Sequence, residues 1–155
     1  MNYLVIAAHP DDEILGCGGS IARWSEEGHD VHLLIMAEGE TSRDEKRDTS
    51  NKTDQLKSLK QAGLKASKKV GAKSIEFLDF PDNRMDSVDL LDVIKHIEKK
   101  VNQIKPTVLI THHIGDLNID HLIIHKAVMT ACRPEVHKSV KKILTFEVNS
   151  STEWN

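Results

Sequence analysis

Short apolar runs alternate along the chain with longer amphipathic segments. Five runs are rich in Val, Ile, Leu and Phe, which is typical of buried β-strands. They occupy residues 3–8, 31–37, 74–80, 107–113 and 142–148. The segments between them place apolar residues at helical spacing or end at glycine or proline, which predicts helices. These helices are expected over residues 18–28, 52–71, 87–104 and 120–132.

This order of elements predicts the fold class α/β. Strands joined by helices form a mostly parallel sheet covered on both faces, so we expect a Rossmann-like three-layer αβα sandwich with strand order 3-2-1-4-5. We expect residues 1–155 to form one domain, because no repeat or proline-rich linker interrupts the pattern. The sequence stops soon after the fifth predicted strand, so we also expect that the C-terminal part of this domain is missing.

One segment, residues 38–52, has no apolar periodicity and is dense in charged and hydroxyl side chains. It directly follows the second predicted strand. Its composition favours a solvated, mobile loop. A lid that covers a substrate is the alternative interpretation.

Composition excludes several classes of protein. The formal net charge is −3 and aromatic residues make up 4% of the chain, so no basic surface with interleaved aromatics indicates nucleic acid binding. No apolar run approaches the roughly 18 residues of a membrane span, and the N-terminus lacks the features of a signal peptide. The two cysteines, Cys17 and Cys132, are far apart and in no CxxC spacing. We therefore expect reduced thiols and a cytoplasmic protein.

The first predicted strand ends in the sequence His9-Pro10-Asp11-Asp12-Glu13. Three consecutive carboxylates repel one another, so the cluster needs a nearby positive charge. The start of a helix offers one through its dipole, and this structural interpretation stays open. A metal ion is the other candidate. An imidazole and a carboxylate three residues apart on a tight turn, completed by a second imidazole, resemble the open three-ligand sites of catalytic zinc.

A second polar loop, rich in histidine, follows the fourth predicted strand. In the strand order 3-2-1-4-5, the carboxyl ends of strands 1 and 4 flank the crevice in which such folds bind ligands, so both polar loops converge there. His112 and His113 alternate in direction, and at most one of them faces the crevice.

His121 and His125 have the spacing of the HExxH metalloproteases, but Leu122 stands where the essential Glu should be. The metalloprotease interpretation is therefore poor, and His125 is expected to pack in the helix or to support a ligand. The remaining histidines receive no role: His29, His32, His96 and His137.

With these motifs in order, the chain resembles the LmbE-like/PIG-L family of zinc-dependent N-acetyl-sugar deacetylases. The resemblance rests on AHPDDE after the first strand, FLDFPDNR after the third and GDLNIDH after the fourth, and it covers essentially the whole chain. It implies that His9, Asp12 and His121 hold a zinc ion, although another divalent metal could replace it. It also implies that Asp11 is the catalytic base that activates water.

The resemblance further implies substrate-binding positions. Asp82 and Arg84 match the region that lines the sugar site, and His113 is a further candidate for substrate binding; an ordinary turn is the structural alternative for this proline- and asparagine-containing stretch. Asn118 stands where many relatives carry a histidine that stabilises the oxyanion. We therefore assign Asn118 a catalytic role, because an amide can donate a hydrogen bond although it cannot become an imidazolium.

Two further positions depart from the family pattern. Leu59 and Ala62 stand where many relatives carry an arginine and a glutamate that recognise the sugar. Arg43 or Arg47 in the charged segment could substitute for them.

The implied function is hydrolytic removal of the N-acetyl group from an N-acetylglucosamine-type amino sugar or its conjugate. The implied partners are this small-molecule substrate and further copies of the chain in a homo-oligomer. A metal- or sugar-binding domain without turnover is the alternative. A nucleotide-binding domain is disfavoured, because GCGG at residues 16–19 follows the acidic cluster and fits close helix–sheet packing better than phosphate binding.

Overall fold

The computed structural model describes residues 1–134 and 138–153 of the chain, so His137 lies outside the described residues. Five parallel strands form one sheet in the order β3-β2-β1-β4-β5. This confirms the predicted strand order. The strands are β1 (Asn2–Ala7), β2 (Asp30–Ala37), β3 (Ser74–Phe80), β4 (Val108–His112) and β5 (Lys142–Phe146).

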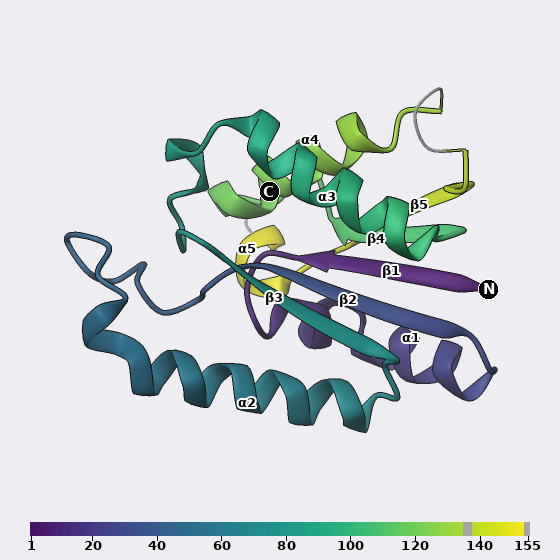
Figure 1. The fold of residues 1–155 in the computed structure, drawn as a ribbon, viewed down its shortest axis with the longest axis horizontal. Coiled ribbons are helices and arrows are strands. Elements are labelled where there is room, and N and C mark those ends of the chain that lie inside the picture. The colour runs from purple at the N-terminus through teal and green to yellow at the C-terminus, as the bar shows by residue number, and fades with distance from the viewer. Residues whose placement is uncertain (135–137, 154–155) are drawn as a thin grey trace.

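Helices cover both faces of the sheet (Figure 1). The helices α1 (Asp12–Glu26) and α2 (Thr53–Lys69) lie on one face, and α3 (Leu90–Ile104) and α4 (Ile119–Ala131) lie on the other. The short helices are η1 (Ser50–Lys52), η2 (Met85–Ser87) and α5 (Asn149–Thr152). The three-layer αβα sandwich predicted from the sequence is therefore confirmed.

The strands separate two apolar cores, because successive side chains of a strand point to opposite faces. In β1, Leu4 and Ile6 pack into the core under α3 and α4, whereas Val5 and Ala7 pack into the core under α1. All four side chains are fully buried. Burial on both faces explains why the strands appear in the sequence as continuous apolar runs.

The first helix begins at Asp12, six residues before the predicted start. Apolar periodicity misses this first turn because its acidic residues are stabilised there by the helix dipole instead. The helix is interrupted at Cys17, whose backbone is not helical. At Gly16 the ring of Phe146 leaves no room for a Cβ atom, so the predicted role of this glycine in close helix–sheet packing is confirmed.

The third helix begins at Leu90 rather than at residue 87, because residues 85–87 form the separate turn η2 and Asp89 occupies the cap position. Within the described residues, no helix is both long and apolar enough to cross a membrane.

The loops after β1 and β2 are in close contact at Gly39. Its φ of +82° lies in the left-handed region, and a Cβ atom built there would lie 2.7 Å from the ring of Pro10. Only glycine fits both conditions without strain. This close approach brings the charged segment against the acidic turn that follows β1.

Candidate metal centre and substrate cavity

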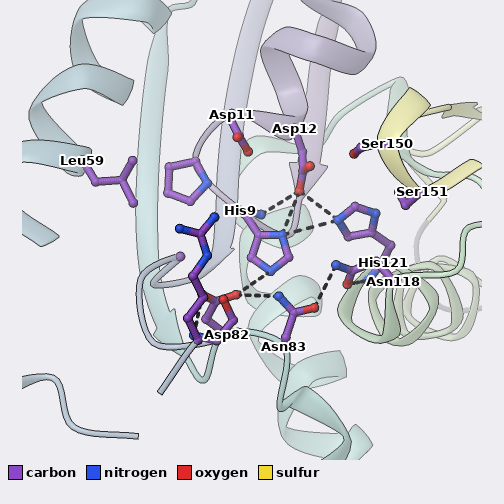
Figure 2. Close-up of a pocket in the computed structure, with 14 residues that line it drawn as sticks. His9, Asp11, Asp12, Leu59, Asp82, Asn83, Asn118, His121, Ser150 and Ser151 are labelled. Atoms are coloured by element: carbon purple, nitrogen blue, oxygen red, sulfur yellow. Dashed lines mark hydrogen bonds and ion pairs between the residues drawn. The ribbon is translucent and has the colours of Figure 1, made fainter. Parts of the chain in front are cut away.

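A cavity of about 430 Å³ opens at the carboxyl edge of the sheet (Figure 2). Its walls come from the loops after β1, β2, β3 and β4, together with residues of α2 and α5. The volume lies within the range of about 300–1,000 Å³ that is typical of small-molecule sites. The cavity therefore occupies the crevice at which the strand order predicted ligand binding.

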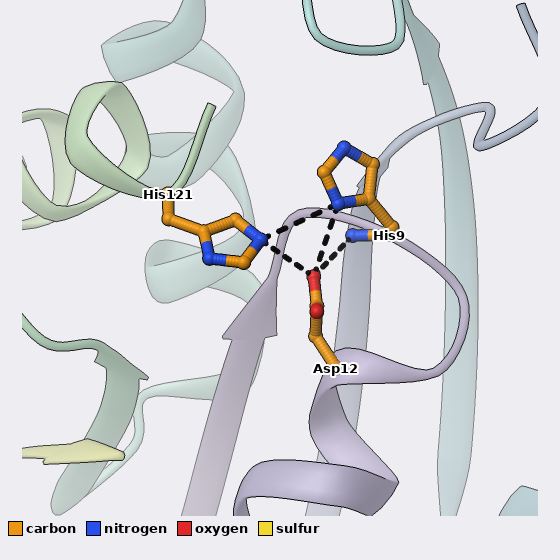
Figure 3. Close-up of side chains that lie close together, drawn as sticks. All are labelled: His9, Asp12 and His121. Carbon is orange, nitrogen blue, oxygen red and sulfur yellow. Dashed lines mark hydrogen bonds and ion pairs between the residues drawn. The ribbon is translucent and has the colours of Figure 1, made fainter. Parts of the chain in front are cut away.

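Three donor atoms meet on one side of this cavity (Figure 3). The Oδ2 atom of Asp12 lies 3.2 Å from Nδ1 of His9 and 3.1 Å from Nε2 of His121. The two imidazole nitrogens lie 3.4 Å from each other. The N–H of His9 also donates to Asp12 Oδ2 at 2.9 Å, which fixes the turn between the two residues. The sequence separates these side chains by more than a hundred residues, and the fold brings them to one point.

The spacing of these atoms fits a tetrahedral metal ion. Zinc held by nitrogen and oxygen at ~2.0–2.1 Å in tetrahedral geometry separates its ligand atoms by about 3.3 Å. The three measured separations lie between 3.1 and 3.4 Å. Two imidazoles and one carboxylate are also the donor types that zinc and several other divalent ions accept. The residues present therefore fit a divalent metal.

Neighbouring carboxylates orient both imidazoles. Nδ1 of His121 lies 2.7 Å from Oδ2 of Asp116. Nε2 of His9 lies 3.1 Å from Oδ2 of Asp120 and 3.2 Å from Oδ1 of Asp82. All three carboxylates are buried. Such carboxylate–histidine pairs fix the ring and leave the other nitrogen free to bind a metal.

The electrostatics of the cluster favour positive charge. Burial lowers the pKa of the His9 imidazole, but hydrogen bonds to Asp12, Asp120 and Asp82 outweigh it and raise the pKa to about 12. Burial raises the pKa of Asp12, but the bonds to His121 and His9 hold it far below its ordinary value. Protons on the imidazoles thus supply the charge that a bound cation would supply.

The three consecutive carboxylates lie in different environments, which relieves their repulsion. Asp12 is buried between the imidazoles, and Asp11 is exposed at the cavity wall. Glu13 is 1% exposed, and burial raises its pKa to about 7. The dipole and metal interpretations are therefore compatible, since Asp12 and Glu13 also occupy the first turn of α1.

Asp11 has a carboxylate that is free for chemistry. Among the described residues, its side chain makes no hydrogen bond or ion pair, although it occupies the cap position of α1. Removal from water raises the pKa of this carboxyl, and the charge of Asp12 raises it further. In Figure 2 it lies beside Asp12 at the cavity. The structure thus places an unpaired carboxylate next to the cluster of donor atoms.

The two consecutive histidines after β4 do face opposite ways. His112 is fully buried, and its ring stacks on that of His121 with centroids 3.7 Å apart. Its Nε2 accepts the N–H of Ala8 at 2.9 Å, so this lone pair is not available to a metal. Burial, and then the charge of His121, hold the pKa of His112 well below its usual range. His112 therefore supports the cluster as a neutral ring.

Two predicted substrate-binding residues lie outside the cavity wall. Nδ1 of His113 accepts the N–H of Gly115 at 3.0 Å, and His113 does not line the cavity. Arg84 does not line it either, and its guanidinium donates to the backbone carbonyl of Asp44. The assignment of substrate contacts to His113 and Arg84 stays a prediction. His125 bonds the carbonyl of His112 through Nδ1 at 2.8 Å, so it packs within the fold.

A chain of hydrogen bonds links the loop after β3 to the start of α4. Asp82 accepts the side-chain N–H of Asn83 at 2.9 Å, and Asn83 accepts the side-chain N–H of Asn118 at 2.8 Å. Asn118 also caps α4, because its Oδ1 accepts the N–H of Asp120 at 2.9 Å and that of His121 at 3.4 Å. One N–H of the Asn118 amide remains for a ligand, and both oxygens of Asp82 are engaged.

The charged segment 38–52 forms one wall of the cavity. Glu38 and Thr41 are buried and hydrogen-bonded to each other, which anchors the start of the segment. Gly39, Ser42 and Arg43 line the cavity. Residues 45–48 are exposed, as expected of a solvated loop. The segment is thus solvated at its tip and structural at its base.

Sequence reasoning missed the two aspartates that orient the imidazoles. Asp116 and Asp120 are fully or almost fully buried, and each engages a ring nitrogen of a metal-site histidine. Both belong to the motif GDLNIDH, so their proximity to His121 in the sequence was the available signal. Their partners depend on the packing of α4 against the other loops, which the pattern alone does not specify.

Taken together, a parallel αβα sandwich with a cluster of two histidines and one aspartate at its carboxyl edge defines the class of α/β proteins with a candidate metal site. The family model described as "PIG-L: GlcNAc-PI de-N-acetylase" matches residues 4–132. The chain therefore belongs to the PIG-L family.

Individual proteins agree with this assignment in sequence and fold. The chain is 33% identical over 153 residues to the "Uncharacterized deacetylase YaiS" of Escherichia coli, covering 96% of this chain and 74% of that protein. The structure of the conserved protein TT1542 from Thermus thermophilus matches with a TM-score of 0.76 and 23% identity, covering 95% of this chain and 66% of that one.

One relative is named for a different reaction. The chain is 27% identical over 128 residues to the 4-oxalmesaconate hydratase of Pseudomonas putida, covering 80% of this chain and 49% of that protein. The chain thus spans between about half and three quarters of the length of these three proteins. Family membership alone consequently leaves the reaction to be argued from the site.

Proposed function

We propose that the chain is a zinc-dependent hydrolase that removes the N-acetyl group from an N-acetylglucosamine-type amino sugar or its conjugate. One observation carries this proposal: three metal-ligand atoms lie within 3.4 Å of one another in a cavity that Asp11 also lines without a protein partner. Membership of a family described as de-N-acetylases supports the choice of reaction. The deacetylase relative supports it as well.

In this proposal His9, Asp12 and His121 hold the metal through the atoms that already face one another. A bound zinc ion supplies Lewis acidity, which polarises the acetyl carbonyl and lowers the pKa of water towards about 7. Asp116 and Asp120 keep the two imidazole rings in the orientation that points a nitrogen at the ion.

Asp11 is the proposed base. Its carboxylate takes the proton of the attacking water and later returns it to the departing amine, so that acetate and a free amino sugar result. The raised pKa of this carboxyl suits both steps, because the group must first accept a proton and then release it.

Asn118 is the proposed donor to the acetyl oxygen. Its carbonyl oxygen is held by the start of α4 and one of its N–H groups by Asn83, so the second N–H has a fixed direction. A fixed donor stabilises developing negative charge without reorganisation.

The test combines metal analysis with product analysis. Purified chain loaded with Zn²⁺ is incubated with N-acetylglucosamine and its glycosides, and released acetate is measured together with bound metal. We expect about one zinc per chain and acetate release. Zinc binding without acetate from any acetylated sugar supports the alternative of a binding domain. Hydration of 4-oxalmesaconate without acetate release supports a hydratase, because addition of water to a double bond frees no acetate.

The carboxylate behind His121 gives a milder test of the metal site. Asp116→Asn keeps the size of the side chain but weakens the bond that orients the ring, so we expect zinc affinity to fall by about 10–100-fold. Competition with a chromogenic chelator measures this. Asp54→Asn in the first turn of α2 is the matched control, since the cavity wall excludes it. Unchanged affinity in Asp116→Asn contradicts the proposed ligand geometry.

A further inference from the structure

Arg43 stands out among the charged groups of the cavity. It is the one lysine or arginine among the described residues that line it. Its guanidinium makes no ion pair or hydrogen bond with any other described residue. The other charged groups of the wall are carboxylates and imidazoles that belong to the metal cluster or lie beside it.

The neighbouring cations are all engaged within the protein. Arg47 lies 3.4 Å from Glu38 and donates to the carbonyl of Asp79 at 2.6 Å. Lys52 lies 2.8 Å from Asp44 and donates to the carbonyl of residue 40 at 2.7 Å. These contacts have a structural purpose, because they tie the charged segment to the rest of the domain. Arg43 does not take part in that network.

The backbone on either side of Arg43 is nevertheless anchored. The N–H of Ser42 donates to Oδ2 of Asp82 at 3.1 Å, and Thr41 is fully buried. On the other side, the carbonyl of Asp44 accepts a hydrogen bond from Arg84. The side chain of Arg43 is therefore presented at the cavity from a fixed point.

The carboxylates of the same cavity do not neutralise Arg43. Asp12 is paired with His9 and His121, and both oxygens of Asp82 accept other hydrogen bonds. An unpaired guanidinium offers a planar fork of donors that matches carboxylate and phosphate groups. A neutral sugar needs no such charge.

We propose that Arg43 binds an anionic group of the substrate, so that the preferred substrates are N-acetylglucosamine conjugates that carry a carboxylate or phosphate next to the sugar. This inference rests on the proposed function. It makes Arg43 a specificity-determining residue, and it replaces a neutral oligosaccharide by an anionic conjugate as the substrate class.

The experiment compares three probes: N-acetylglucosamine 1-phosphate, N-acetylglucosamine α-linked to malate, and the neutral methyl α-glycoside of N-acetylglucosamine. We expect the wild-type chain to favour one or both anionic probes in kcat/KM. In Arg43→Gln, the ratio of anionic to neutral kcat/KM should fall by about 10–100-fold, as expected for loss of a charged hydrogen bond. The two anionic probes show whether carboxylate or phosphate is the better partner.

Lys46→Gln is the matched control, since it removes the same charge from an exposed position of the same segment outside the cavity wall. We expect this variant to keep the wild-type ratio. An equal loss in both variants attributes the effect to net charge and overturns the inference. An unchanged ratio in Arg43→Gln overturns it as well.

Binding of the same probes, measured by calorimetry, separates this inference from the proposed function. If no probe releases acetate but the affinity for anionic probes depends on Arg43, the proposed deacetylase fails and the anionic subsite stands. If acetate is released from all three probes at rates that ignore their charge, the deacetylase stands and the subsite fails.

Discussion

Replacement of His121 by alanine is expected to abolish stoichiometric zinc binding and to reduce acetate release to background. His121 supplies one of the three candidate ligand atoms, and its Nε2 lies 3.1 Å from Asp12 and 3.4 Å from His9. Loss of an outer partner of a ligand typically costs about 10–100-fold in metal affinity, and loss of the ligand itself should cost more. Elemental analysis of the purified variant measures the first effect, and an acetate assay measures the second.

His125→Ala is the matched control for this experiment. It makes the same substitution one helical turn later in α4, where the ring bonds the carbonyl of His112 instead of the metal cluster. We expect this variant to retain zinc. Thermal unfolding of both variants separates a loss of ligand from a loss of fold. Stoichiometric zinc in a folded His121→Ala protein would falsify the proposed ligand set.

The second large effect is expected at Asp11. Asp11→Asn should bind zinc as the wild type does but lose about 10²–10⁴-fold in kcat, which is the usual contribution of a positioned acid–base group. The amide has nearly the same size and cannot accept the proton of the attacking water. Among the described residues the carboxylate of Asp11 has no partner, so its removal breaks no contact within the fold.

Asp86→Asn provides the comparison for Asp11→Asn, because it removes one negative charge from an exposed residue outside the cavity wall. Its kcat should stay within about twofold of the wild type, as surface changes usually do. Full turnover in Asp11→Asn with zinc bound shows that another group acts as the base.

The sequence predicted the fold well because the information is local and repeated. Five apolar runs separated by helical segments restrict the chain to a few topologies, and chirality and packing rules reduce them further. The convergence of His9 with His121 followed from topology alone, since the carboxyl ends of β1 and β4 are neighbours in this strand order. Long-range geometry was thus available from the strand order.

Side-chain partners were harder to predict. The alternation of His112 and His113 was visible, but not which ring would lie against His121. The direction of Arg84 towards Asp44 depends on how the charged segment folds back, and the sequence carries no periodic signal there. Burial of Glu13 beside two further carboxylates also has no local signature. Each of these depends on contacts between segments rather than on spacing within one.

Asp120 has a consequence for how this protein can change over time. One carboxylate accepts the backbone N–H groups of Asn83 and Met85 while it also bonds the ring of His9. A mutation that reshapes the turn after β3 to suit a new sugar thus also displaces an imidazole of the metal cluster. Selectivity and metal affinity are therefore epistatic in this domain, and new specificities should arise more readily through the walls contributed by α2 or the charged segment.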